Sequence, residues 1–403
     1  MNNPVPPEFH FTKEMETLLA ICRARLEGDT GLSIGPDNLN TGLVRAAMFH
    51  RVIPFIYPWL KKHLWENVGQ NLQKSLLWMA KRQKIKSLRL TAELTTIAKL
   101  FRQQGLETIS LKGPLMTIEL YGNLSDRHQG DIDLLGSVKD LHKVRLLLEG
   151  LGYQLEGDAG MLSTALRFKA YMKSTQHVLF VNHQKKVRLE YHYRLFKNPN
   201  LMPLPLEELK QNLREIQYGG VTIKRLSLLD SVLYLFVHGS NHEWYRLKWL
   251  LDIAYLTRLP DLDWRQLYVH AKGLGVERMV QQGLQLAHKM LGAKIPEDYP
   301  LPETPHRTIT KLVRRGAEKI NNSAHGRDIE RKFYLLKLRR GLRYKNYILW
   351  MQLHLDFHQT GSKLPDPLFF LHYLINPLLW FYRKTIGRRW ANRKKNNTGN
   401  RRK

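Results

Sequence analysis

Apolar residues recur at helical spacing along much of residues 12–104. A repeat of three to four residues places such side chains on one face of an α-helix. Two of these groups are Met15, Leu18, Leu19 and Cys22, and Leu90, Leu94, Ile97 and Phe101. The pattern predicts a largely helical N-terminal region.

The spacing changes near residue 106 to short apolar runs at 108–111 and 131–135, which are typical of β-strands. Residues 138–151 return to a helical pattern that ends at Gly152, as a helix with a glycine cap does. Two more strand-like runs, 177–181 and 187–192, flank residues 182–186. They predict a β-hairpin with a longer loop.

The helical spacing resumes from 226 to 291, and the chain beyond 296 is basic, aromatic-rich and predicted to be helical. We therefore predict a predominantly helical α+β protein in which helical regions flank a small mixed sheet. The expected regions are a helical region at 1–104, an α/β core at 105–200, a helical region completing a cleft at 201–295, and a basic helical region with a disordered tail at 296–403.

The composition places the chain among ordinary folded proteins, since 43% of its 403 residues are hydrophobic and 25% are charged. The single cysteine, Cys22, excludes an internal disulfide and fits a reducing compartment. Residues 1–8 lack the features of a signal peptide, and no apolar run reaches the length of about 20 residues that spans a membrane. We expect a cytoplasmic protein.

The net charge of +29 favours polyanionic partners. Residues 383–403 hold ten Lys or Arg and no acid, and the apolar, aromatic segment 367–382 precedes them. This C-terminal region predicts contact with nucleic acid or with an anionic membrane surface, the latter as a peripheral protein of the inner membrane. The alternative is that 367–382 forms a helix packed on the body of the protein.

Two aspartates, Asp131 and Asp133, interrupt an apolar strand pattern, although aspartate is depleted in strands. Residues two apart on a strand face the same side, so the two carboxylates repel unless a cation lies between them. Mg²⁺ prefers carboxylate oxygens together with substrate phosphates. The pair therefore predicts a metal site, whereas the alternative for Asp-x-Asp is a solvated turn.

Three other features support this interpretation. Glu190 would bring a third carboxylate to the aspartates if its strand neighbours theirs. Lys112 and Gly113 follow an earlier strand, where glycine lets backbone N–H groups approach phosphates and lysine supplies charge. Arg127 lies just upstream of the aspartates. Three carboxylates on two Mg²⁺ ions, with Mn²⁺ as the alternative, would form a two-metal site for phosphoryl or nucleotidyl transfer.

The sequence also resembles a known family. The segments that carry the resemblance are Leu111-Lys-Gly113, Leu120-Tyr121, Arg127, Asp131-Ile-Asp-Leu-Leu135, Gly152-Tyr153, Glu190-Tyr-His192, residues 238–252 and residues 262–264. Together they resemble the bacterial nucleotidyltransferase-like proteins of the DNA polymerase β superfamily, over about residues 45 to 295. The resemblance implies a polymerase-β-like core with Asp131 and Asp133 as the metal pair and Glu190 as the third acid. The Gly-Ser helix start of the wider superfamily is not evident, and Lys112-Gly113 takes a similar place.

Further polar residues are candidates for supporting roles. His238 and His242 share a helical face, but the zincin glutamate is absent, so we assign them a structural or substrate-facing role. His192 shares a strand face with Glu190 and would orient it, and the alternative is a surface position without such a role. The resemblance makes Lys248 a phosphate ligand, and the alternative is an ion pair with Asp252 one helical turn away.

The leading hypothesis is a Mg²⁺-dependent nucleotidyltransferase. Its substrates would be an NTP and an acceptor that is a protein, an RNA or a small molecule. Asp131, Asp133 and Glu190 would bind metal, Glu190 would help to deprotonate the acceptor, and Lys112, Arg127 and Lys248 would neutralise the triphosphate. The alternatives are a catalytically silent nucleotide- or nucleic-acid-binding protein, and a peripheral membrane protein of a surface-polysaccharide or peptide-modification pathway. The preferred base, the acceptor, the pathway and the oligomeric state stay open.

Overall fold

The computed structural model describes residues 9–156, 164–301, 306–321 and 328–354, together with positions 365, 368, 371, 374, 375, 377 and 378. Contacts divide the chain into two units. The first holds Met1–Glu156 and His177–Arg340, and the second holds Gly157–Gln176 and Gly341–Lys403. The basic tail at 383–403, most of the apolar segment 367–382 and residues 1–8 lie outside the described residues.

A seven-stranded mixed sheet forms the centre of the first unit, in the order β3-β4-β5-β2-β1-β7-β6. Its strands are β1 (Thr108–Ser110), β2 (Ile132–Gly136), β3 (Gln154–Glu156), β4 (His177–Asn182), β5 (Val187–His192), β6 (Arg214–Tyr218) and β7 (Val221–Arg225). Strand β2 pairs in parallel with β5 and antiparallel with β1. The predicted predominantly helical α+β fold is confirmed.

The hairpin β4–β5 forms as predicted, with Asn182 opposite Val187 across the turn. A second hairpin, β6–β7, was not anticipated within the region 201–295, which we expected to be helical. Its strands alternate between polar and apolar residues at the edge of the sheet, so they carry no continuous apolar run. The signal that marks them is the Gly219-Gly220 turn, where both glycines have positive φ values.

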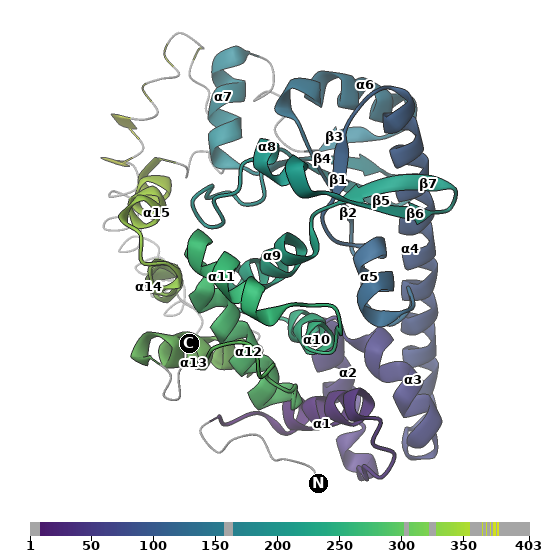
Figure 1. The fold of residues 1–403 in the computed structure, drawn as a ribbon. Coiled ribbons are helices and arrows are strands. Elements are labelled where there is room, and N and C mark those ends of the chain that lie inside the picture. The colour runs from purple at the N-terminus through teal and green to yellow at the C-terminus, as the bar shows by residue number, and fades with distance from the viewer. Residues whose placement is uncertain are drawn as a thin grey trace, which may run out of the picture. The chain divides into compact units, whose positions relative to one another are not determined.

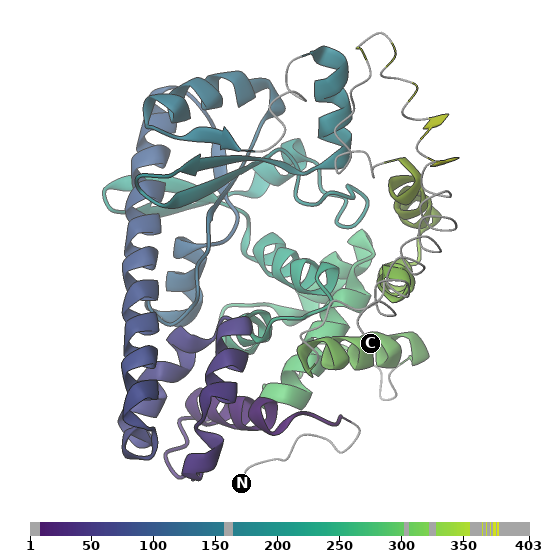
Figure 2. The same ribbon diagram turned by 180° about the vertical axis from the view of Figure 1, so that it is seen from behind.

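Four helices precede the sheet and confirm the predicted helical N-terminal region: α1 (Lys13–Glu27), α2 (Thr41–Phe49), α3 (Ile53–His63) and α4 (Gln70–Gln103). Helix α4 has 34 residues and runs from the N-terminal helices along the sheet (Figures 1 and 2). Its residues Leu90, Leu94, Ile97 and Phe101 are buried, as their spacing predicts. The sheet therefore rests on one long helix whose other end reaches α3.

Helices also follow the individual strands. After β1 and β2 come α5 (Pro114–Tyr121) and α6 (Leu141–Gly150), and after β7 come α9 (Leu228–Asn241), α10 (Leu247–Leu256), α11 (Trp264–Leu274) and α12 (Glu277–Leu291). Beyond them lie α13 (Arg307–Asn321) and α14 (Asp328–Leu338), and a short α8 (Leu206–Leu209) precedes β6. Within the described part of the chain, we found no helix with the length and apolar character needed to cross a membrane.

The second unit contains α7 (Ala165–Ser174) and α15 (Leu342–His354). Its buried Ala170 packs against Tyr171, Trp350 and Met351. An apolar contact between residues so far apart in the sequence joins the two segments of this unit.

His50 connects the N-terminal helices to α10. It caps α2, its side chain is buried, and its Nδ1 accepts a hydrogen bond of 3.2 Å from the backbone N–H of Leu247. Burial, followed by the positive charge of Arg246, lowers the pKa of His50 to about 4. The imidazole is therefore neutral in the folded protein well below its ordinary range.

Because of His50, we expect the free energy of unfolding to fall in acid. Between pH 6.5 and pH 4 the unfolded chain binds a proton at His50 and the folded chain does not, so stability falls as the pH falls through that window. His50→Asn keeps an acceptor but removes the titration. Urea unfolding at pH 7.5 and pH 5 should show a pH-dependent loss smaller by about 2 kcal/mol in the variant. An equal loss in both proteins would mean that His50 does not carry this effect.

Candidate active site

The aspartates lie where β2 begins at the centre of the sheet. Asp131 directly precedes the strand and is half-buried, whereas Asp133 lies within it and is fully buried. Because β2 and β5 are parallel neighbours, Asp133 stands opposite Glu190 in the register. Adjacent residues in register project to the same face of a sheet. The pairing of the strands thus brings together two acids that are 57 positions apart in the chain.

His192 joins these two carboxylates. Its Nε2 lies 3.2 Å from Asp133 Oδ1 and 3.2 Å from Glu190 Oε2. Burial would raise the pKa of Glu190, but the hydrogen bond from His192 and the charge of His177 outweigh it and lower that pKa to about 2. The same carboxylates raise the pKa of His192 against the effect of its own burial. The group is therefore built to keep Glu190 ionised.

Lys112 provides the cation that faces Asp133. Its Nζ lies 2.9 Å from Asp133 Oδ1. Burial would raise the pKa of Asp133, yet Lys112 and the hydrogen bond from His192 lower it below its ordinary value. Burial likewise opposes the charge of Lys112, but Asp133 and the other nearby acidic groups raise its pKa well above the usual value. Both groups are charged at neutral pH.

Gly113 connects β1 to the first turn of α5. Its φ of 90° and ψ of −139° suit glycine alone, and a Cβ here would lie 3.5 Å from the carbonyl oxygen of Asp131. The turn therefore brings the start of α5 against the segment that carries Asp131. Lys112 and Gly113 lie beside the acids, as the sequence analysis expected of a phosphate-binding turn.

The donor atoms fit a divalent cation. Asp133 Oδ2 is buried and has no hydrogen-bond partner among the described residues, and such an atom is costly unless something binds it. Among the described residues, one group of three potential ligands has all its donor atoms within 4.8 Å of one another: His177, Glu190 and His192. Asp131 and Asp133 do not complete a second such group with Glu190. The carboxylate oxygens suit Mg²⁺ and Mn²⁺, whereas the two imidazoles of this group are ligands that suit Zn²⁺ or Fe²⁺.

His177 was not singled out from the sequence. It pairs with His192 across the hairpin, and the two ring centroids are 5.0 Å apart. Counting back along both strands from the predicted loop at 182–186 would have placed it there. The position of His177 could thus be derived from the strand pairing of the predicted hairpin, and not from any local motif.

Arg127 is engaged in a buried ion pair. Its Nε and Nη2 donate to the two carboxylate oxygens of Asp252 over 2.7 and 2.9 Å, and Tyr121 donates its hydroxyl to the same carboxylate over 2.8 Å. Asp252 therefore pairs with Arg127 and not with Lys248, the alternative that the sequence left open. The pair ties the loop before Asp131 to α10, and we assign Arg127 a positioning role.

Lys248, unlike Arg127, has no carboxylate beside it among the described residues. Its side chain is buried on α10, and among the described residues no carboxylate lies within ion-pair distance of its ammonium. Burial, together with Arg127 and Arg51, lowers the pKa of Lys248 well below the usual value. A negatively charged group beside this ammonium would favour its protonated form.

His238 and His242 belong to an aromatic cluster on α9 and the start of α10. Their rings lie 5.5 and 5.2 Å from that of Trp249, and His242 stacks on it. Burial lowers the pKa of both, to about 3 for His242. They belong to no group of metal ligands among the described residues. Their contacts are those of packing residues, in agreement with the structural role considered from the sequence.

A family model described as "uncharacterised nucleotidyltransferase" matches residues 39–292 of the chain. This range contains the whole sheet and every residue of the candidate active site. No curated protein and no solved structure matches the chain.

Proposed function

The chain belongs to the family described as uncharacterised nucleotidyltransferase, and on that premise we propose a metal-dependent transfer of an NMP group from an NTP to an acceptor. In this reaction an oxygen or nitrogen of the acceptor forms a bond to the α-phosphorus. The bond to the leaving pyrophosphate breaks, and the acceptor loses a proton. The acceptor is a hydroxyl, phosphate or amine.

The observation that supports the proposal is the register pairing of Asp133 with Glu190, with the ammonium of Lys112 2.9 Å from Asp133 and the backbone of Asp131 against the Gly113 turn. Asp133 and Glu190 are register partners, and Asp133 Oδ2 lacks a partner among the described residues. Acids grouped beside a phosphate-binding turn are the arrangement that metal-assisted phosphoryl chemistry requires. An acidic cluster with a purely structural role would have its buried oxygens paired.

Asp131, Asp133 and Glu190 would hold the divalent ions. When bound, such ions neutralise phosphate charge and make an acceptor oxygen easier to deprotonate. Glu190 is held ionised by its surroundings, so in this proposal it accepts a hydrogen bond from the acceptor and orients it. Lys248 and the backbone of the Gly113 turn bind the triphosphate, and Arg127 holds the loop through Asp252.

The contact between Lys112 and Asp133 favours a second candidate, a binding protein without catalysis. An ammonium 2.9 Å from the carboxylate neutralises it without any metal. In that case nucleotides would bind through Lys248 and the Gly113 turn alone. Their affinity would then be independent of divalent cations.

Thermal unfolding with and without divalent cations tests the proposal. The wild-type chain with a non-hydrolysable NTP analogue should be stabilised further by Mg²⁺ or Mn²⁺, by about 2.7 kcal/mol at ligand concentrations 100-fold above Kd. Glu190→Gln should lose most of this metal-dependent gain, because it removes a ligand charge. The matched control is Glu215→Gln, at an exposed position on β6, which should behave as the wild type.

Two results would separate the candidates. A gain with the analogue that is the same in EDTA as in Mg²⁺ would support the silent binding protein and contradict metal-dependent transfer. A metal-dependent gain that survives in Glu190→Gln would remove Glu190 from the metal site.

A further inference from the structure

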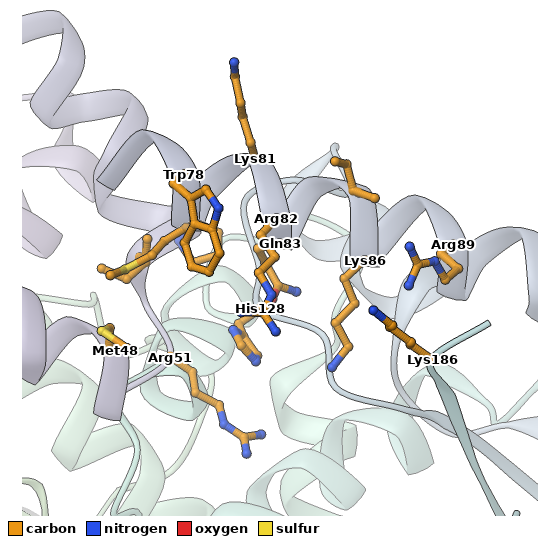
Figure 3. A pocket seen from close by; sticks show the side chains of 14 residues that line it. Met48, Arg51, Trp78, Lys81, Arg82, Gln83, Lys86, Arg89, His128 and Lys186 are labelled. Carbon is orange, nitrogen blue, oxygen red and sulfur yellow. The ribbon is translucent and has the colours of Figure 1, made fainter. Parts of the chain in front are cut away.

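A cavity of about 830 Å³ lies against α4, and its charged lining residues are all cationic (Figure 3). We name it the basic cavity and define it by the cations Arg51, Lys81, Arg82, Lys86, Arg89 and Lys186. In Figure 3 the side chain of Lys86 points from α4 toward the side on which Arg51 lies, whereas that of Lys81 points the opposite way. Among the residues that the structure describes, no Asp or Glu lines this cavity.

The cations of the basic cavity have no partners of opposite charge within ion-pair distance among the described residues. The first acid of helix α4 is Glu93, and its carboxylate pairs with Lys185 over 2.7 Å and accepts a hydrogen bond from Tyr153. Burial lowers the pKa of Lys86 and of Arg51, and neighbouring cations lower both further, whereas the carboxylate of Asp131 raises them. A cluster that repels itself in this way is relieved by an anionic ligand.

The basic cavity borders the segment that leads into Asp131. His128, three residues before Asp131, lines it, and Arg51 Nη1 lies 3.9 Å from the place that a Cβ on Gly130 would occupy. Gln83 of α4 donates a hydrogen bond of 3.0 Å to the backbone carbonyl of Gln129 and fixes this segment to the helix. A ligand in the cavity would therefore have one end near residues 128–130, which lead directly into Asp131.

The shape of the charged lining favours a strand over a single phosphate group. From Trp78 to Arg89 the helix rises about 16 Å at 1.5 Å per residue. Trp78 is 59% exposed at one end of the cavity, with the guanidinium of Arg82 5.1 Å from its ring centre. Exposed aromatic rings among cations stack bases while the cations bind the phosphates of a single strand. An acidic peptide would use the cations but not the ring.

We propose that the basic cavity binds single-stranded nucleic acid and directs its end toward Asp131. The role of that end as the acceptor rests on the proposed nucleotidyl transfer. Binding of the strand does not, so the two can fail separately.

Anisotropy of labelled single-stranded RNA and DNA 12-mers, titrated with the full chain over a series of salt concentrations, tests this proposal. Replacing Lys86 and Arg89 together by glutamine should weaken binding at least about tenfold at 100 mM salt. The slope of log K against log salt should become shallower by about 1.4, since each lost phosphate contact on a single strand removes about 0.7. Trp78→Ala should weaken binding about 5- to 100-fold and leave this slope unchanged, because stacking releases no counterions.

The matched control removes two cations from the same helix outside the cavity, Lys74→Gln with Lys99→Gln, which are both exposed. It should bind within about twofold of the wild type with the same slope. Binding is measured without NTP and without divalent cations, so a failure of nucleotidyl transfer does not affect this test of the cavity. Equal affinities and slopes for the cavity double variant and its control would overturn the proposal. Polyglutamate and unlabelled RNA are also compared as competitors at equal concentrations of negative charge. If polyglutamate displaces the labelled strand as well as the RNA does, the proposal is overturned.

Discussion

Replacing Asp131 or Asp133 by asparagine is expected to lower nucleotidyl transfer by at least about a thousandfold. Asparagine keeps the size of the side chain but removes the charge that would bind a divalent ion. Loss of metal-based stabilisation of about 4 kcal/mol in the transition state corresponds to that factor. Asp131 is half-buried, and its side chain has no hydrogen bond or ion pair with any residue that the structure describes, so Asp131→Asn should fold as the wild type does.

The measurement is the transfer of label from α-labelled NTPs to components of a cell extract. Asp37→Asn serves as the control, because Asp37 is exposed and far from the strand β2 in the sequence. Asp133→Asn leaves Lys112 without its carboxylate, so its unfolding curve is recorded beside its activity. If Asp131→Asn labels the same component at the wild-type rate, the proposed mechanism is wrong.

Arg127→Met is expected to lower the free energy of unfolding by about 3–5 kcal/mol. Both partners of the Arg127–Asp252 pair are buried, so the substitution leaves the carboxylate of Asp252 in the interior without its cation. Tyr121 still donates its hydroxyl to the carboxylate of Asp252, but a hydroxyl carries no positive charge to balance it. Urea unfolding followed by circular dichroism measures the change.

Arg314→Met provides the comparison on the surface. Arg314 pairs with Glu318 one turn along α13, and the two side chains are 76% and 44% exposed. Loss of such a pair costs about 0.5 kcal/mol. In the variant Arg127→Met with Asp252→Leu, most of the loss should be recovered, because no unpaired charge is left in the interior. A loss below about 1 kcal/mol in Arg127→Met would show that the pair does not hold the loop to α10.

Local pattern determined much of the fold. The spacing of Leu90, Leu94, Ile97 and Phe101 predicted the buried face of α4, and the two runs around 182–186 predicted the hairpin β4–β5. Both signals arise between residues that are near one another in the chain, where backbone geometry fixes which side chains share a face. The hairpin β6–β7 was not predicted, because an edge strand needs no continuous apolar run.

The candidate site could be predicted only in part. Aspartate inside a strand pattern pointed to Asp133, because a buried carboxylate is costly without a cation. The sequence did not reveal which cation faces it, and the structure places Lys112 there. It also left Asp252 free to pair with Lys248, whereas the fold pairs it with Arg127 across 125 positions.

The sequence by itself determined the helices of the N-terminal region, the helix after β2, the hairpin β4–β5 and the acidic character of β2, since each depends on neighbours within a few residues. Only the tertiary structure decided that β5 lies beside β2, that His177 and His192 meet Glu190, and that α4 and the segment before Asp131 enclose a basic cavity. Those features depend on which distant segments pack together. Pairing of strands and burial of apolar faces set that choice over the whole chain, and no local spacing records it.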